Sequence, residues 1–199
     1  MTKLLEKKLK PLKMDYESYY PTPDAAVLLA LYGQVQQPQL ILTQRATHLN
    51  SHAGEVSFPG GKWEPADTGP GDTALRETEE EIALPRRQVA LLGELPDHFS
   101  KKGLRVKPIV GWVDELPDLI PSPDELDAVF SVPLEFFLAD QRIRTDIYSS
   151  QGVTYWSPAW QFEQYEIWGL TARILVDLLN DVFDANLGRL NPAPERLRV

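Results

Sequence analysis

The chain has 199 residues, 43% of them hydrophobic and 25% charged, which is an ordinary balance for one globular domain with modest additions. Its formal net charge of −9, from 20 basic and 29 acidic residues, argues against nucleic acid or an anionic membrane as the main partner. The lack of cysteine excludes disulfides, thiolate zinc sites and cysteine nucleophiles. No apolar run approaches the roughly 18 residues that span a bilayer, and the N-terminus lacks a signal-peptide core, so we expect a cytoplasmic protein.

Three parts can be distinguished along the chain. The N-terminal part, residues 1–23, begins with a predicted short basic helix over residues 3–10. The main domain follows over residues 24–185. The remaining residues, 186–199, are expected to form a tail that frays after Gly188.

Within the main domain, apolar runs separated by turn residues predict strands. These runs cover residues 24–33, 38–45, 89–95, 105–113 and 128–132, and a hairpin follows around Ser149–Gly152. A stretch rich in glycine, proline and small polar residues, 48–72, has the length of a functional loop. It leads into a helix whose start Asp72 or Thr73 can cap. A second helix, with an apolar stripe, is predicted over residues 165–183.

The first helix carries four glutamates in five positions, within the sequence RETEEEIAL. With about 100° of rotation per residue, Glu77, Glu80 and Glu81 share one face of the helix, and Glu79 points away from it. The residues expected to anchor the helix on its opposite side are Leu75, Thr78 and Ile82.

Three converging carboxylates raise one another's pKa and are costly without a countercharge. A divalent hard cation removes that cost, and ligands that are all oxygen suit Mg²⁺ or Mn²⁺. A solvated acidic face is the competing interpretation for the glutamate run taken alone. The sequence FPGG at residues 58–61 favours metal binding, because glycine lets the backbone approach a ligand closely.

The glycine pair, the acidic loop and the R-E-x-x-E-E run together resemble the Nudix box, G-x5-E-x7-R-E-U-x-E-E-x-G-U, in which U is aliphatic. The segment 61–84 departs from this pattern in three ways. One extra residue separates Gly61 from Arg76. Thr78 replaces the first aliphatic residue, and Ala83 stands where glycine is usual.

Residues 40–61, LILTQRATHLNSHAGEVSFPGG, are similar to the motif of the coenzyme A pyrophosphatases within that superfamily, L-L-T-x-R-[SA]-x3-R-x3-G-x3-F-P-G-G. Asn50 is the departure, since the motif has arginine at this position. The resemblance spans roughly residues 25–180, and the two motifs together are far more specific than either one alone.

The resemblance implies an α/β fold, the Nudix-type α/β/α sandwich around a mixed β-sheet, and hydrolysis of a pyrophosphate bond. Metal ions that clamp the phosphates neutralise their charge and can activate the attacking water. The metal ligands implied by the resemblance are Glu77, Glu80 and Glu81, with the Gly61 carbonyl as a backbone ligand. Arg76 is interpreted as a structural partner that orients one of these glutamates.

The general base comes from different places in this family, often from a box glutamate or from an acid on a later loop. We expect Glu80 or Glu125 to fill this catalytic role, with Asp124 as a third candidate. A solvated loop acid is the competing interpretation for Glu125.

Candidate substrate contacts are basic or aromatic residues near the motifs. Arg45 is the best phosphate-binding candidate, because a guanidinium can bind phosphate through two hydrogen bonds. The other predicted substrate-binding residues are Phe58, Lys101, Lys102 and Arg105. Packing under the loop is the alternative for Phe58 and Trp63, and surface solubility is the alternative for each lysine. His48 and His52 could assist the phosphates, although isolated loop histidines are more often not ligands.

The leading hypothesis is Mg²⁺- or Mn²⁺-dependent hydrolysis of coenzyme A and its thioesters, giving 3′,5′-ADP and 4′-phosphopantetheine or its acyl form. Asn50 keeps a second hypothesis open, a Nudix hydrolase of another nucleoside diphosphate derivative such as NADH, ADP-ribose or an oxidised dNTP. A third is a degenerate Nudix domain that regulates by binding metal or nucleotide, and the complete set of box glutamates argues against it. The expected partner is a small-molecule substrate, not nucleic acid or a membrane, and a homodimer is left open.

Overall fold

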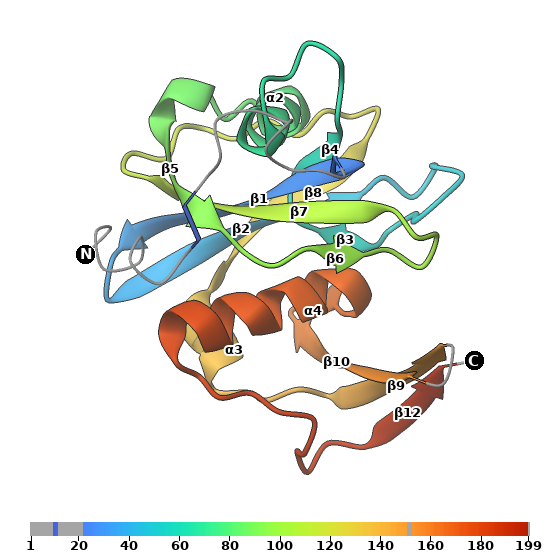
Figure 1. Ribbon diagram of the computed structural model, residues 1–199. Helices are drawn as coiled ribbons and strands as arrows, with labels where there is room; N and C mark the ends of the chain where they lie inside the picture. Colours follow the sequence, from blue (N-terminus) through green and yellow to red (C-terminus); the bar gives the residue numbers. More distant parts are fainter. Residues whose placement is uncertain (1–9, 12–21, 151–152, 199) are drawn as a thin grey trace.

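The computed structural model describes residues 10–11, 22–150 and 153–198 (Figure 1). The basic helix expected within residues 3–10 lies outside the described residues, apart from Lys10, which forms an isolated β-bridge with Glu94. In the described part of the chain, no helix has both the length and the apolar character needed to cross a membrane.

A mixed sheet forms the centre of the molecule. Strands β1 (Ala25–Gln34) and β2 (Gln37–Arg45) make the expected antiparallel hairpin, and β7 (Arg105–Val113) lies parallel to β1. The central order is β3-β2-β1-β7-β5, with β4 paired to β1, β6 to β7 and β8 to β2. The remaining strands of this sheet are β3 (Val56–Ser57), β4 (Gly60–Lys62), β5 (Val89–Glu94), β6 (His98–Phe99) and β8 (Leu126–Pro133).

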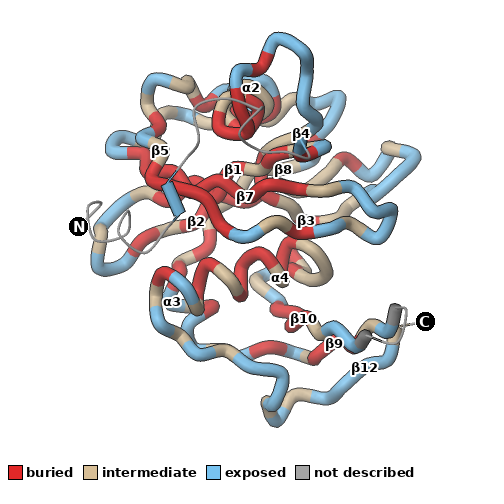
Figure 2. The backbone as a smooth tube through the Cα atoms, viewed as in Figure 1, coloured by how far each residue is buried: buried red, intermediate tan, exposed pale blue. Residues whose placement is uncertain are grey.

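Helices cover both faces of this sheet, as Figure 1 shows. Helix α2 (Pro70–Ile82), followed by the 3-10 turn η2 (Arg86–Gln88), lies on one face. Helix α4 (Gly169–Asp177) continues into the π-helical turn η3 (Leu178–Val182) on the other face, beside the short helix α3 (Leu134–Leu138). The central strands are therefore buried on both sides, which explains why β1 is a continuous apolar run without alternation (Figure 2).

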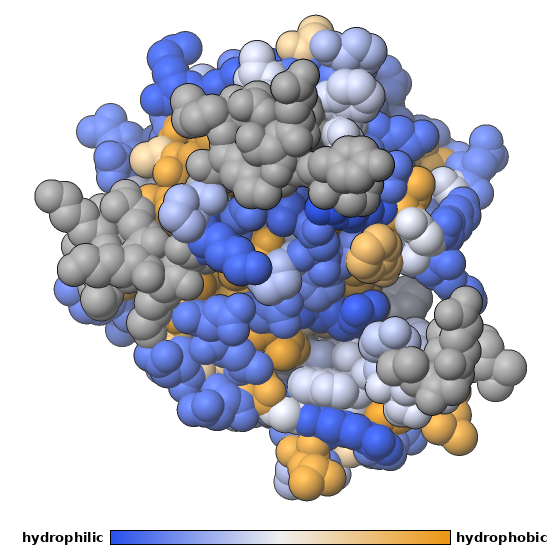
Figure 3. Space-filling view, in the orientation of Figure 1, coloured by the Kyte–Doolittle hydropathy of each residue, from blue (hydrophilic) through white to orange (hydrophobic). Residues whose placement is uncertain are grey.

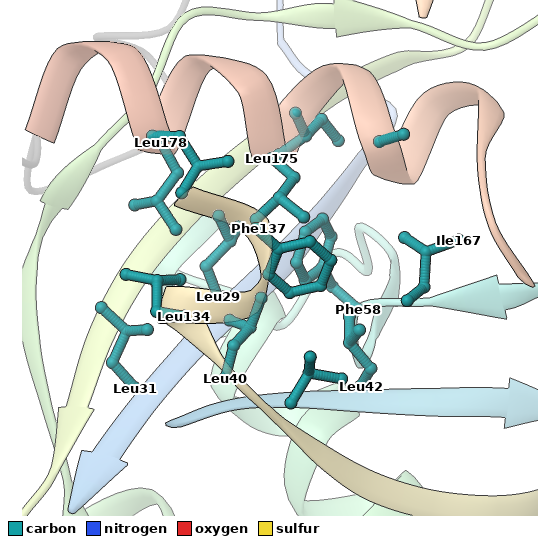
Figure 4. Packing of buried hydrophobic residues seen from close by; sticks show 14 of the residues in the cluster. Leu29, Leu31, Leu40, Leu42, Phe58, Leu134, Phe137, Ile167, Leu175 and Leu178 are labelled. Carbon is teal, nitrogen blue, oxygen red and sulfur yellow. The ribbon is translucent and has the colours of Figure 1, made fainter. Parts of the chain in front are cut away.

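Two apolar clusters fill the space between the layers. One packs the α4 face of the sheet and includes Leu29, Leu40, Phe137 and Leu175 (Figure 4). The other lies under α2, where Ile82 packs with residues of β1 and β7. The α/β/α sandwich around a mixed sheet, expected from the sequence, is confirmed.

A second, smaller sheet follows α3, in the order β11-β10-β9-β12. Its strands are β9 (Arg144–Ser150), β10 (Val153–Phe162), β11 (Tyr165–Ile167) and β12 (Glu195–Arg198). The helix expected from residue 165 begins only at Gly169, because Tyr165–Ile167 pairs with β10 instead. The tail also differs from expectation: Glu195–Arg198 pairs in parallel with β9, so the end of the chain is held by backbone hydrogen bonds.

Candidate active site

Helix α2 begins at Pro70, whose fixed φ suits the first helical turn. Gly69 is the N-cap residue, and no side chain caps the helix. The expected cap by Asp72 or Thr73 is therefore wrong. The Thr73 hydroxyl donates to Asp67 at 2.9 Å, while the Asp72 carboxylate pairs with Arg86 at 2.8 Å.

The faces of α2 follow the helical periodicity. Thr78 and Ile82 are fully buried, and Leu75 packs against the same cluster as Ile82. Glu79 is exposed and its carboxylate accepts a hydrogen bond from Arg86 Nε at 3.1 Å. Glu79 is thus the glutamate that takes no part in the acidic face.

Glu81 is the most buried glutamate of the run, with 5% of its surface exposed. Its Oε2 accepts a hydrogen bond of 3.0 Å from the backbone N–H of Gly60, which joins the glycine pair to the helix. Burial raises the pKa of Glu81 to about 7, and the charges of Glu125 and Glu77 add to this effect. The Gly60 N–H and the charge of Arg45 oppose it only in part.

Glu77 lies directly against Gly61. A Cβ atom added to Gly61 would come within 2.4 Å of the Glu77 carboxyl carbon, so glycine is required for this approach. Burial raises the pKa of Glu77 despite the nearby Arg76, and the charges of Glu80 and Glu125 raise it further. The carboxylate of Glu77 therefore sits in an acidic surrounding in contact with the glycine pair.

Arg76 connects the loop before α2, strand β4 and the acidic face. Its Nη1 donates to Glu77 at 3.1 Å and to Glu80 at 3.2 Å, and its Nη2 donates to the Lys62 carbonyl at 2.9 Å. Its Nε and Nη2 bind the two carboxylate oxygens of Asp67 at 2.9 and 3.0 Å. Arg76 thus positions two of the glutamates through its own fixed geometry.

Asp67 is a site residue that our sequence reasoning missed. It is buried, and it receives hydrogen bonds from Arg76, Thr73 and the Glu64 backbone N–H. Its spacing from Gly61 corresponds to the G-x5-E part of the Nudix box, with aspartate in place of glutamate. That spacing was the signal that could have identified it.

A loop after β7 brings Glu125 to the same site. The backbone N–H of Ser122 donates to the Glu81 carbonyl at 2.8 Å, and the Ala46 N–H donates to the Glu125 carbonyl at 2.8 Å. This loop is thereby tied both to the end of α2 and to the end of β2. Glu125 acts electrostatically on Glu77 and Glu81, whereas Asp124 contacts His48 through its backbone carbonyl, at 3.3 Å.

The other base candidate, Glu80, has a more open position. Its side chain is 60% exposed, and its ion pair with Arg76 is 3.2 Å long. Glu80 lies at the solvent-exposed edge of the acidic face, whereas Glu125 is carried by the loop after β7.

The residues present fit a divalent cation in their chemistry. Among the described residues, no three acidic or histidine side chains already stand together as a finished ligand set. Arg76 holds Glu77, and the Gly60 N–H holds Glu81, so each carboxylate is engaged separately. However, the charge of Glu125 raises the pKa of both Glu77 and Glu81, and the charge of Glu77 raises that of Glu81 further, which is the repulsion that a bound cation relieves.

Arg45 stands at the end of β2, close enough for its charge to act on Glu81. Its Nε is buried and has no hydrogen-bond partner in the described part of the chain. A buried donor without an acceptor is costly, and an anionic ligand would supply the acceptor. Asn50 is exposed in the loop that follows β2.

Two of the other substrate-binding candidates, Phe58 and Arg105, have partners within the protein. Phe58 is only 3% exposed and packs within the cluster under α4, so it is a core residue (Figure 4). Arg105 pairs with Asp97 at 2.6 Å, whereas its Nη1 is buried without a hydrogen-bond partner in the described part of the chain, so its role as a substrate contact stays a prediction. Sequence alone could not show either packing partner. Lys101 and Lys102 are exposed on the turn between β6 and β7.

Of the remaining candidates, Trp63 borders a cavity and His52 is engaged within its own loop. Trp63, 38% exposed, lines a cavity of about 420 Å³ with Lys62 and Leu104, next to the glycine pair. His52 pairs with Glu55 at 2.8 Å within its own loop.

Comparison with known proteins places this arrangement in a family. The NUDIX domain family matches residues 21–148. The chain belongs to this family. It is 43% identical over 157 residues to the Nudix hydrolase NudL of Escherichia coli O7:K1, a match that covers 77% of this chain and 80% of the relative.

Two further comparisons extend this result. The chain is 39% identical over 178 residues to "Nudix hydrolase 15, mitochondrial" of Arabidopsis thaliana, and the match covers 86% of the chain but 62% of the plant protein. Among solved structures, the MutT/nudix family protein of Enterococcus faecalis has a similar fold, with a TM-score of 0.52 and 16% identity. That alignment covers 85% of this chain and 68% of the other.

The expected enzyme class, a Nudix pyrophosphohydrolase, is confirmed by this membership. Nudix hydrolases generally use divalent metal ions and act on small nucleotide derivatives. Within this family, the acidic face of α2, the glycine pair and the Glu125 loop form the candidate active site.

Proposed function

We propose that this Nudix hydrolase cleaves the pyrophosphate bond of coenzyme A and its thioesters, with Mg²⁺ or Mn²⁺, to give 3′,5′-ADP and 4′-phosphopantetheine or its acyl form. The proposal places the activity in the part of the chain over residues 24–185. A cytoplasmic location belongs to the same proposal.

One observation carries this proposal: residues of the motif at 40–61 come together against the acidic helix. Arg45 acts on Glu81, Gly60 binds Glu81 at 3.0 Å, and Gly61 is in close contact with Glu77. The motif that resembles the coenzyme A pyrophosphatases is therefore not a separate surface. Arg45 and the glycine pair of this motif lie beside the carboxylates of α2 in one candidate site, where a pyrophosphate can contact both groups.

The chain's own groups divide the work of hydrolysis. We assign Glu77, Glu80 and Glu81, with the Gly61 carbonyl, to the metal, which when bound would neutralise phosphate charge and lower the pKa of a coordinated water. Arg45 binds a phosphate oxygen through its Nε, which has no hydrogen-bond partner among the described residues. Glu125 accepts the proton from the attacking water, with Glu80 as the alternative base. The water oxygen bonds to phosphorus as the bridging oxygen leaves with the second phosphate.

The test is a comparison of substrates at saturating Mg²⁺ and Mn²⁺. We expect a kcat/KM for coenzyme A at least about tenfold above those for NADH, ADP-ribose and an oxidised dNTP, which corresponds to about 1.4 kcal/mol in transition-state stabilisation. Dephospho-coenzyme A should react more slowly if a basic group binds the 3′-phosphate. Equal rates for NADH or ADP-ribose would overturn the assignment.

Asn50 supports the second candidate, a Nudix hydrolase of another nucleoside diphosphate derivative, because asparagine cannot supply the charged fork of the motif arginine. Its exposed position leaves room for a longer side chain. Asn50→Arg should lower KM for coenzyme A, or leave activity unchanged if Arg45 already binds that phosphate. A large loss of activity would show that Asn50 has a local role in its loop.

A further inference from the structure

A cluster of arginines lies on the small sheet. The carboxylate of Asp146 is fully buried and accepts hydrogen bonds from three arginines. They are Arg196 at 2.7 and 3.0 Å, Arg144 at 3.1 Å and Arg198 at 3.2 Å. Arg144 also pairs with Glu166 of β11. These contacts connect β12 to β9, and β9 to β11, and this is the structural role of the arginine cluster.

The cluster has more positive charge than this role requires. Arg173 of α4 belongs to the same neighbourhood, because its charge acts on Tyr148 together with those of Arg144 and Arg196. Four guanidinium groups, counting Arg198, thus stand against three carboxylates, those of Asp146, Glu166 and Asp177. A local surplus of positive charge in a protein of net charge −9 indicates a preference for an anion.

Several of these polar groups have no partner in the described part of the chain. The hydroxyl of Tyr148 and the Nε of Arg198 are both buried without a hydrogen bond. Arg173 contacts the ring of Tyr155, with its guanidinium carbon 5.5 Å from the ring centre, and no described carboxylate pairs with it. Of these groups, Arg173 is only half-buried, so an anionic ligand can reach its guanidinium and accept its hydrogen bonds.

Arg173 and Tyr155 line a cavity of about 430 Å³ between α4 and β10. The carboxylate of Asp177, which also lines it, is engaged by His98 at 2.8 Å. The side chain of Asn180 is bound to the backbone of Leu187. Figure 3 shows side chains of intermediate hydropathy gathered below α4, over the small sheet. The cavity therefore combines aromatic surface with one arginine that pairs with no carboxylate of the described residues, and its volume suits a small organic molecule.

We propose that this cavity binds a small aromatic anion of mononucleotide size, with its phosphate on Arg173 and its ring against Tyr155. A guanidinium forms charge-assisted hydrogen bonds with phosphate, and a tyrosine ring packs against a flat base. The cavity is separate from the candidate active site, because α4 and α2 cover opposite faces of the main sheet (Figure 1). It is a second ligand site, and it does not depend on the proposed substrate.

The test is calorimetric titration of the full chain with AMP, without divalent metal. Saturable binding is expected, and Arg173→Gln should weaken it by about tenfold or more, as loss of a charged phosphate contact would. Arg173→Lys should retain part of the affinity, and Tyr155→Leu should reduce it. Arg87→Gln removes the same charge from an exposed position on η2 and should leave binding unchanged. Inorganic phosphate and adenosine should each bind more weakly than AMP.

Binding to the two sites can be told apart. Glu81→Gln should keep AMP binding while losing turnover, and Arg173→Gln should lose AMP binding while keeping turnover, with thermal unfolding used to verify that both variants fold. The opposite pattern, with AMP lost in Glu81→Gln and kept in Arg173→Gln, would assign AMP to the active site and overturn the proposal. Absence of saturable AMP binding to the parent protein would overturn it as well.

Discussion

The guanidinium of Arg76 holds the carboxylate of Asp67 through two parallel hydrogen bonds, Nε to Oδ1 at 2.9 Å and Nη2 to Oδ2 at 3.0 Å. This pair connects the loop before α2 to the residue that orients Glu77 and Glu80. Arg76 therefore links this loop directly to the acidic face of α2.

We expect Asp67→Asn to destabilise the protein by about 1–3 kcal/mol at pH 7, because a buried charged hydrogen-bond pair is broken. Burial alone would raise the pKa of Asp67, but the hydrogen bonds from Arg76 lower it overall. The stability that ionised Asp67 contributes is therefore present above the pKa that Asp67 has in the unfolded chain. It is lost as the pH falls through the lower pKa of Asp67 in the folded protein. Urea unfolding at pH 7 and at about pH 3 measures this difference.

The same substitution at Asp72, whose ion pair with Arg86 is more exposed, provides the control. Asp72→Asn should cost less than Asp67→Asn, because exposed pairs contribute about 0–1 kcal/mol. Equal losses at the two positions would contradict the role given to the Arg76 pair.

The effect on kcat of replacing a glutamate of α2 should depend on which face of the helix carries it. Glu77→Gln and Glu81→Gln should each lower kcat by about a hundredfold or more, since each deletes a charge that we assign to the proposed metal site, a loss of about 2.7 kcal/mol. Glu79→Gln, on the face that contacts Arg86, should stay within about threefold of the parent. Steady-state kinetics with saturating Mg²⁺ decides between these outcomes. Three harmless substitutions would restore the solvated-face interpretation.

Metal-free Glu81→Gln should be more stable than the parent above pH 7. The pKa of Glu81 is raised to about 7 by burial, so the folded state resists its ionisation. The free energy of unfolding of the parent therefore falls as the pH rises from the pKa that Glu81 has in the unfolded chain to about 7. Above that pH the full loss, up to about 3 kcal/mol, remains. Unfolding of both proteins at about pH 5 and pH 8 should show the difference only at the higher pH.

Added Mg²⁺ should reverse this order, because the parent gains more binding free energy than the variant. A parent that gains no stability from Mg²⁺ would contradict the metal role of Glu81.

Ala83 terminates α2 with φ 56° and ψ 27°, a left-handed conformation in which a Cβ is strained. This explains why glycine is usual at this position of the box. Ala83→Gly should stabilise the protein by about 0.5–1 kcal/mol in thermal unfolding, after the entropic cost of glycine is subtracted. Ala139→Gly, at a helix end with φ −69°, is the matched control and should destabilise it.

Local pattern determined much of the fold. The apolar runs of β1, β2 and β7 identify strands, and helical periodicity places Thr78 and Ile82 inward and Glu79 outward. These features depend on steric preferences within a few residues, so they can be read from the chain without partners.

Tertiary structure decided which distant residues share the site. Glu125 reaches the acidic face only because its loop hydrogen-bonds to the ends of α2 and β2. Phe58 enters the core, although it lies within the loop motif, because α4 covers that face of the sheet. The tail becomes strand β12 through the contacts of Arg196 with Asp146, which lies 50 positions earlier in the chain. Such contacts depend on chain segments that meet only after folding, and no local rule for side-chain spacing contains that information.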